Sequence, residues 1–584
     1  MRRILLTLFF LLPLESPLFA AAPLDMPGLI RRLAAPELEG RRTGEPGGAR
    51  AAALLEEQLA ALGSTPLPGF DGWRQPFSFV SRAEPSACRL RDARGRELGG
   101  RPGSLLALAA SADGNVRAPL AFCGYGLAAA DWDDYQGAEL AGRIALIVRQ
   151  VPESLGPGGA PWTRACRLSE RVAAARRAGA RAVLVADSPF AQRPELERAD
   201  SPDAALGNAG LPLAAVDAAL ADSLLAPLGQ GLKSLVSRIT RARAPQPAQP
   251  LADSLELEIR VQRHERAGAN LGAMLPGAGA AANRWVLVCA HFDHLGRGAD
   301  GQGPLHPGAD DDASGTAMVL ALGQAVRDAL PQEGPGRRSL ALVIFDGEEQ
   351  GQLGSRSLVA ARPPWLDSLE LVVNLDMVGR LRENTLHVLG GGGHPELMPS
   401  LEAAAAAAGL VARPCAAAPG GDHESFLAVG VPALMLFTGA HEDYHKPGDT
   451  VDKINVAGLE QVRDALAGWL PALLDPALRV SRDAPAPPAR GEGAPVKVAL
   501  GIVPGYESTD GGMPVQDVRP DSPAAAAGLR KGDVVVALGA FPVANIHDYT
   551  FALRHFAAGD QVPVVLLRDG RRLQLTATLA ERRP

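Results

Sequence analysis

The strongest constraint on the fold is a series of polar motifs, most of which directly follow a run of apolar residues. They are HFDH at 291–294, GADDDASG at 308–315, DGEEQG at 346–351, Asp376, and YHKPGDT at 444–450. Apolar runs at 285–290, 339–345, 371–375 and 432–437 alternate with helical patterns, so residues 251–475 are predicted to form an α/β layer structure. Ligands of open α/β sheets bind beyond the carboxyl ends of strands. The motifs are therefore predicted to converge on one site.

The residue types in these motifs suit two divalent ions. Zinc accepts imidazole and carboxylate ligands at about 2.0–2.2 Å, and two-metal sites hold their ions about 3.5–4 Å apart. The pair Glu348 and Glu349 offers one ligand and one carboxylate that stays free to take a proton from water. Asp293 is a candidate to hold the second ring nitrogen of His291. Any one motif alone would more often be a helix cap or a solvated charge, whereas the combination favours a metal site.

The ordered set HFD, GADDDASG, DGEEQGQLGS, NLDMVG and YHKPGDT resembles the co-catalytic dizinc exopeptidases of the bacterial leucyl aminopeptidase and glutamate carboxypeptidase type. The resemblance covers roughly 26–63 and 251–475, and implies a mixed sheet sandwiched by helices and two Zn²⁺ per chain. The roles it implies are His291 and Asp376 for one zinc, Glu349 and His445 for the other, Asp311 as the bridge, Glu348 as general base, and Tyr444 as a donor to the oxyanion. It also implies a cis peptide bond between Asp311 and Asp312.

One motif departs from the family pattern. Many relatives carry Ser-Asp-His where this chain has Gly421, Asp422 and His423. Asp422 and His423 can line the pocket or make a structural hydrogen bond, and the sequence leaves both readings open. The remaining histidines without an assigned role are predicted not to be ligands; these are His294, His306, His387, His394 and His441.

The predicted peptidase domain comprises residues 23–115 and 241–478 and is joined to two accessory modules. Residues 116–240 resemble a protease-associated domain inserted into the peptidase, with a generic α/β insertion as the alternative. Residues 479–495 are rich in Pro, Ala and Gly and read as a linker. Residues 496–584 resemble a β-rich PDZ domain whose carboxylate-binding loop is Leu500, Gly501 and Ile502. Such a loop can hold the C-terminal carboxylate of a peptide ligand; a structural PDZ domain without a free ligand is the alternative.

The first 22 residues read as a signal peptide. Arg2 and Arg3 precede an apolar run at 4–14, which is too short to span a bilayer, and small residues follow at 20–22. We therefore expect an exported protein, periplasmic or secreted, with no integral membrane segment after cleavage. The net charge is −7 and no block of Lys or Arg is dense, which argues against nucleic acid as a partner. The 5 cysteines contain no CxxC pair, so no thiolate zinc site is indicated.

The functional prediction is an exported zinc-dependent aminopeptidase that removes N-terminal residues from peptide substrates. A carboxypeptidase or dipeptidase could use the same metal site with a different pocket. A glutaminyl cyclase is a further alternative, but cyclases of this type typically use one zinc. A non-catalytic receptor-like relative would have lost ligands, and none is missing here.

Overall fold

A computed structural model describes residues 24–581 except for short gaps. The gaps are 130–131, 136–139, 152–165, 167, 191–208, 247, 299–300, 330–335, 416–419, 483–497, 505–511, 540, 544–548, 550–551, 554–555 and 557. The predicted signal peptide at 1–22 and most of the predicted linker lie outside the described residues. Among the described helices, none combines the length and the apolar character that a membrane crossing needs.

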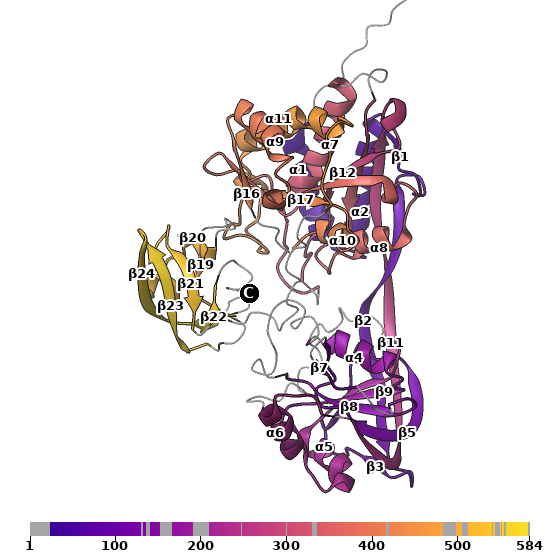
Figure 1. Cartoon of the computed structure of the whole chain (residues 1–584). Coiled ribbons are helices and arrows are strands. Elements are labelled where there is room, and N and C mark those ends of the chain that lie inside the picture. Colours follow the sequence, from indigo (N-terminus) through magenta and orange to yellow (C-terminus); the bar gives the residue numbers. More distant parts are fainter. Residues whose placement is uncertain are drawn as a thin grey trace, which may run out of the picture.

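The part of the chain predicted to be the peptidase domain, called the peptidase part below, is built on seven strands of a 15-stranded mixed sheet (Figure 1). In sheet order these strands are β16 (Val411–Cys415), β15 (Thr385–Leu389), β17 (Ala433–Phe437), β14 (Leu369–Leu375), β12 (Trp285–His291), β13 (Ser339–Phe345) and β11 (Gln249–Leu275). Strands β12, β13, β14 and β17 pair in parallel. Their carboxyl ends therefore share one edge of the sheet.

Helices cover both faces of this sheet, because alternate side chains of its strands point to opposite sides. Val286 and Val288 of β12 pack into the larger core with helices on one face. Leu287 and Cys289 pack into a smaller core on the other face. The helices of the first face are α1 (Met26–Leu33), α2 (Pro46–Ala61), α7 (Ala313–Ala329), α9 (Met398–Ala407) and α11 (Val456–Leu474); those of the second are α8 (Leu353–Ala361) and α10 (His423–Leu427).

Two long antiparallel strands connect the peptidase part to the inserted unit. Strand β2 (Arg74–Arg91) pairs with β11 along most of its length, and both run between the two parts in Figure 1. The inserted unit contains β3 (Glu97–Leu98), β4 (Leu105–Ala107), β5 (Gly114–Phe122), β8 (Ile144–Val148), β9 (Ala182–Ala186), β10 (Leu213–Val216), α4 (Leu168–Arg177), α5 (Ala218–Leu225) and α6 (Leu232–Ala242). Its core also takes Leu90, Ala107 and Leu257 from outside the predicted 116–240.

The C-terminal unit is a small antiparallel sheet with its own core. Its main elements are β19 (Ile502–Pro504), β20 (Met513–Val518), α12 (Pro523–Ala527), β21 (Val534–Leu538), β23 (Gln561–Arg568) and β24 (Arg571–Thr578). Lys531 of this unit lies 3.1 Å from the Glu383 carboxylate of the peptidase part. The mixed sheet sandwiched by helices and the separate β-rich C-terminal unit confirm the predicted fold class.

Candidate metal centre

The predicted ligands meet at the carboxyl-end edge of the parallel strands. His291 is the last residue of β12, and Asp376 directly follows β14. Glu349 lies in the turn after β13, Asp311 lies two residues before α7, and His445 lies in the loop after β17. The sequence places one polar loop at each strand end, so the sheet itself brings residues up to 154 positions apart, His291 and His445, into one cluster.

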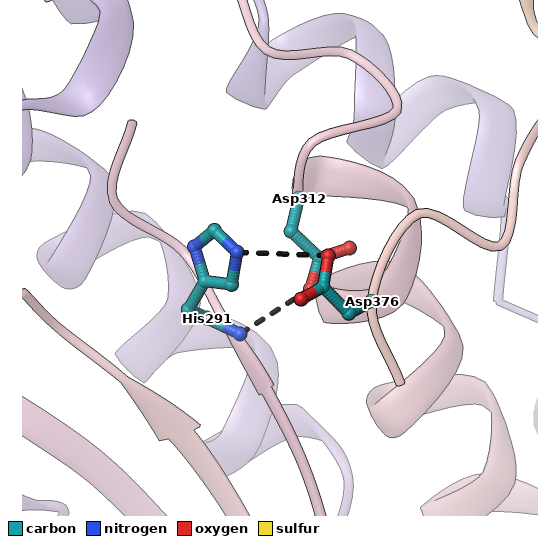
Figure 2. A group of neighbouring side chains, drawn as sticks. All are labelled: His291, Asp312 and Asp376. Carbon is teal, nitrogen blue, oxygen red and sulfur yellow. Dashed lines mark hydrogen bonds and ion pairs between the residues drawn. The ribbon is translucent and has the colours of Figure 1, made fainter. Parts of the chain in front are cut away.

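The first half of the cluster is formed by His291, Asp311 and Asp376. The Nε2 atom of His291 lies 3.3 Å from Oδ1 of Asp311 and 3.9 Å from Oδ1 of Asp376. Figure 2 shows the imidazole facing the Asp376 carboxylate. All three side chains are nearly inaccessible to solvent. These atoms are close enough to bind one ion after small adjustments.

The second half of the cluster is formed by Asp311, Glu349 and His445. The Nε2 atom of His445 lies 3.2 Å from Oδ2 of Asp311 and 3.0 Å from Oε2 of Glu349. Asp311 thus turns one carboxylate oxygen toward each half. This is the arrangement that a bridging ligand between two ions requires.

Asp312 lies beside the cluster but has another task. Its carboxylate accepts hydrogen bonds from the backbone N–H groups of His291 at 3.3 Å, Gly315 at 2.8 Å and Met377 at 3.2 Å. Figure 2 shows the contact with His291. Asp312 therefore caps the start of α7 and ties it to the ends of β12 and β14. The Asp311–Asp312 peptide bond is cis, as the family resemblance implied.

His294 is predicted from the sequence not to be a ligand, yet the structure brings it into the cluster. Its Nδ1 atom lies 2.7 Å from Oε1 of Glu349 and 3.8 Å from Oδ2 of Asp311. The His294 side chain is fully buried, whereas that of His445 is 34% exposed. Glu349 thus faces His294 with one oxygen and His445 with the other. His445 is therefore the imidazole on the accessible side of the cluster, and His294 is the imidazole on the buried side.

Asp293 supports the cluster in two ways, through its backbone oxygen and through its carboxylate. Its backbone oxygen lies 3.1 Å from Nδ1 of His291 and so accepts a hydrogen bond from that ring nitrogen, which leaves Nε2 free for an ion. Its carboxylate lies 3.7 Å from the same nitrogen. That carboxylate accepts hydrogen bonds from the backbone N–H groups of Glu348 at 3.0 Å and Glu349 at 3.3 Å. Asp293 thereby orients one predicted ligand and the turn that carries two acidic residues.

The charges of the cluster shift the pKa values of its members strongly. Burial raises the pKa of Glu348 well above its usual range, and the charges of Glu349 and Asp422 add to this effect. Burial also raises the pKa of Asp376 to about 7. Burial lowers the pKa of His445, but the carboxylates of Glu349 and Asp311 outweigh it and raise that pKa to about 11. Burial therefore makes the charged form of these carboxylates unfavourable in the free protein, and a cation bound beside them would offset that cost.

A cavity of about 320 Å³ opens onto the cluster. Its lining includes the acidic and imidazole groups His291, Asp311, Glu348, Glu349, Asp376 and His445. It also includes apolar residues that pack together as one cluster, Met377, Leu389, Met435, Phe437 and Ala440. Tyr444 also lines the cavity, 44% exposed, with its ring stacked on His445 at 3.9 Å between centroids.

Other residues singled out in the sequence occupy different places. Asp422 and His423 are buried at the start of α10, and the charge of Asp422 reaches Glu348 and Asp376. His387, His394 and His441 contact Cys415, Glu396 and Asp310, respectively. In the C-terminal unit, the backbone oxygens of Leu500 and Gly501 accept hydrogen bonds from Ala524 at 2.7 Å and Arg519 at 2.9 Å. Ile502 begins β19.

The donor set fits zinc. Imidazole nitrogens and carboxylate oxygens, the ligands that zinc accepts, come together in two groups: His291, Asp312 and Asp376 in one, and His294, Asp311 and Glu349 in the other. Within the described residues, Oδ2 of Asp311 is buried and accepts no hydrogen bond, so a bridging oxygen is left with capacity for an ion. Both halves contain Asp311. Glu348 lies beside them, and neither half needs its carboxylate as a metal ligand.

The structure places a cluster of possible metal ligands at the strand ends of a mixed α/β sheet, and comparisons with known proteins show which families this chain resembles. Residues 270–470 match the family model of Peptidase family M28, and residues 498–579 match that of the PDZ domain. The central part of the chain therefore resembles an M28 peptidase, and the part near its C-terminus resembles a PDZ domain. The match to M28 begins at residue 270, so the segment before that residue lies outside it.

Several curated proteins resemble parts of the chain. Aminopeptidase YwaD of Bacillus subtilis (strain 168) is 27% identical over 190 residues, which are 31% of this chain and 39% of that protein. A probable leucine aminopeptidase of Trichophyton verrucosum (strain HKI 0517) is 25% identical over 224 residues, 36% of this chain and 59% of that protein. The chain thus spans about two to three fifths of the length of these relatives.

Among solved structures, an aminopeptidase from Aneurinibacillus sp. strain AM-1 is similar with a TM-score of 0.45 and 23% identity. The likeness covers 78% of this chain and 94% of that one. A glutaminyl cyclase of Porphyromonas gingivalis is similar over 36% of this chain and 80% of its own, with a TM-score of 0.31 and 20% identity.

Proposed function

We propose that the protein is an exported dizinc aminopeptidase that removes apolar residues from the N-termini of peptides. The observation that carries this proposal is the lining of the cavity. Four carboxylates line it (Asp311, Glu348, Glu349 and Asp376), and no Arg or Lys does among the described residues. Such a cavity suits the ammonium group of a free N-terminus, and its described lining has no Arg or Lys side chain to hold a free C-terminal carboxylate.

Each half of the cluster would hold one zinc ion. His291 and Asp376 would bind the first ion and Glu349 and His445 the second, with Asp311 bridging them through its two oxygens. Bound zinc supplies Lewis acidity that polarises a carbonyl and lowers the pKa of water. His294 would fix Glu349 from the buried side.

Glu348 is the proposed general base. It lines the cavity beside both halves, and Asp293 holds its backbone N–H at 3.0 Å. From this place its carboxylate can take a proton from the attacking water and return it to the leaving amine. Tyr444, at the mouth of the same cavity, can donate its hydroxyl proton to the oxyanion that develops on the scissile carbonyl.

The apolar side of the cavity indicates which side chain it accepts. Met377, Leu389, Met435 and Phe437 face the space next to the cluster. Ligand pockets lined in this way bury an apolar group, and each methylene that fits contributes about 0.8 kcal/mol. A leucine, methionine or phenylalanine at the N-terminus therefore suits the cavity better than a charged residue.

A substrate screen tests this function. We expect zinc-loaded protein to hydrolyse leucyl substrates with a free amine at least about tenfold faster, in kcat/KM, than aspartyl or lysyl substrates, because the apolar wall rejects a charge. N-acetylated leucyl substrates should not react. Release of C-terminal residues from N-blocked peptides would contradict the aminopeptidase assignment, and cyclisation of N-terminal glutaminyl peptides would indicate the cyclase instead.

The accessory units extend the proposal. We assign residues 116–240 to a protease-associated domain that edges the peptidase, and residues 1–22 to a signal peptide that directs the protein to the periplasm or outside the cell. A peptide with a free C-terminus would bind the PDZ domain at Leu500, Gly501 and Ile502 and add a strand beside β19. Peptides are thus proposed as partners of both the cavity and the PDZ domain.

Deleting residues 484–584 should lower kcat/KM on a short leucyl substrate by less than about tenfold. The ligand-bearing residues all precede position 446, and the ion pair between Lys531 and Glu383 joins side chains that are 68% and 77% exposed. Such surface pairs contribute at most about 1 kcal/mol, and about 1.4 kcal/mol corresponds to tenfold. Kinetics of folded, zinc-loaded full-length and truncated proteins make the comparison. A larger loss would show that the PDZ domain shapes the cavity.

A further inference from the structure

A short N-terminal segment, residues 40–43, lies against the loops that carry the metal centre. It is outside the region that matches the M28 family. The Arg42 guanidinium donates to the backbone oxygen of Leu295 at 3.3 Å, and the Gln350 amide donates to that of Thr43 at 3.3 Å. The segment therefore touches both the loop after β12 and the turn after β13.

Arg41 anchors this segment in the interior. Its guanidinium is fully buried and donates to four backbone oxygens, those of Leu33, Phe292, Pro307 and Gly308, at 2.6–2.8 Å. These oxygens belong to the end of α1, the residue after His291 and the loop before Asp311. Since all four bonds go to the backbone, Arg41 fixes the path of the chain and so determines where Thr43 lies.

Thr43 makes the direct connection to the site. It is 1% exposed, and its hydroxyl donates to Oδ2 of Asp293 at 3.0 Å. The same carboxylate accepts the backbone N–H groups of Glu348 and Glu349, and the backbone oxygen of Asp293 accepts the ring N–H of His291. The Thr43 hydroxyl therefore acts on Asp293. Asp293 in turn orients the proposed base, Glu348, and the proposed ligands Glu349 and His291.

A second buried carboxylate, Asp346, lies on the other side of this hydroxyl. Burial and the charge of Asp293 raise the pKa of Asp346 to about 7, while the hydrogen bond from Thr43 lowers it. Oδ2 of Asp346 accepts the backbone N–H of Ala269 at 3.0 Å. The Thr43 hydroxyl therefore interacts with two acidic side chains, Asp293 and Asp346.

We propose that Thr43 is a positioning residue of the metal centre, which acts through Asp293 on His291 and on the turn of Glu348 and Glu349. The expected effect of Thr43 on catalysis rests on the proposed function, whereas its expected effect on metal binding does not. Without the hydroxyl, Oδ2 of Asp293 keeps only the longer 3.3 Å bond from Glu349. Loss of a partner that orients metal ligands typically weakens metal binding 10–100-fold.

The test is zinc affinity, measured by competition with a chelator of known affinity. Thr43→Val replaces the hydroxyl with a methyl group of similar size and should raise the zinc dissociation constant at least about tenfold. Thr43→Ser keeps the hydroxyl and should stay within about threefold of the wild type. Thr240→Val is the matched control, because the Thr240 hydroxyl donates to Val236 within α6, far from the site. It should leave zinc affinity unchanged.

A smaller loss of affinity in folded Thr43→Val protein would overturn the proposal, as would an equal loss in Thr43→Ser. If Thr43→Val does not fold, Thr43→Ala removes the same hydroxyl and decides by the same criterion. The kinetics of zinc-saturated protein give a second readout, in which kcat should fall with KM nearly unchanged. If the wild type binds zinc but cleaves no peptide, the proposed function is wrong, while the zinc measurement still decides the role of Thr43.

Discussion

Replacing Glu348 with glutamine is expected to lower kcat at least about 100-fold while zinc content stays at the wild-type level. The amide has nearly the same shape as the carboxylate but cannot accept a proton, and loss of a general base typically costs 10²–10⁴-fold. Glu348 lines the cavity, and neither half of the metal cluster needs it as a ligand. Steady-state kinetics on a leucyl substrate, together with metal analysis of the same samples, give both numbers.

The neighbouring residue provides the control. Glu349→Gln removes a carboxylate oxygen that lies 3.0 Å from Nε2 of His445, so it should lose zinc as well as activity. If instead Glu348→Gln remained active while Glu349→Gln kept its zinc and lost activity, the two roles would be reversed.

Replacing Asp311 with alanine is expected to remove both zinc ions and nearly all activity. Its two oxygens face different halves of the cluster, at 3.3 Å from His291 and 3.2 Å from His445, so the substitution removes a carboxylate oxygen from each half. Loss of the ions removes several kcal/mol of transition-state stabilisation, and about 4 kcal/mol corresponds to roughly 10³-fold in rate. Metal analysis after dialysis against a weak chelator measures the zinc that remains.

Asp464→Ala is a suitable control for this substitution. Asp464 lies on α11 with its side chain 61% exposed and paired with Arg463. Its removal should change neither zinc content nor kcat. An Asp311→Ala protein that kept one zinc with full affinity would show that the two halves bind their ions independently and that Asp311 does not bridge them.

Much of the fold followed from local patterns. The apolar runs at 285–290 and 339–345 became β12 and β13, because strands buried on both faces need apolar side chains at every position. The polar residues after each run then had to meet at one edge, which is why convergence could be predicted from the sequence. The separate roles of Asp311, Glu348 and Glu349 could not be predicted from the spacing of the residues. They were predicted from the resemblance to a family.

The supporting contacts could not be read from the sequence. Thr43 and Asp293 are 250 positions apart, and nothing in either segment indicates that they meet. No sequence pattern distinguishes His294 from His306 or His441. Among these three, only His294 lies against Glu349 in the described part of the structure. The long strands β2 and β11 depend on pairing over 18 and 27 residues, which local periodicity does not reveal.

The most direct test of the account is the number of zinc ions that full activity requires. Metal-free protein would be titrated with zinc while hydrolysis of a leucyl substrate with a free amine is followed, and bound metal would be counted in the same samples. The two halves of the cluster, joined by Asp311, predict that activity reaches its plateau at two zinc ions per chain. Full activity with one bound ion per chain would contradict the dinuclear site.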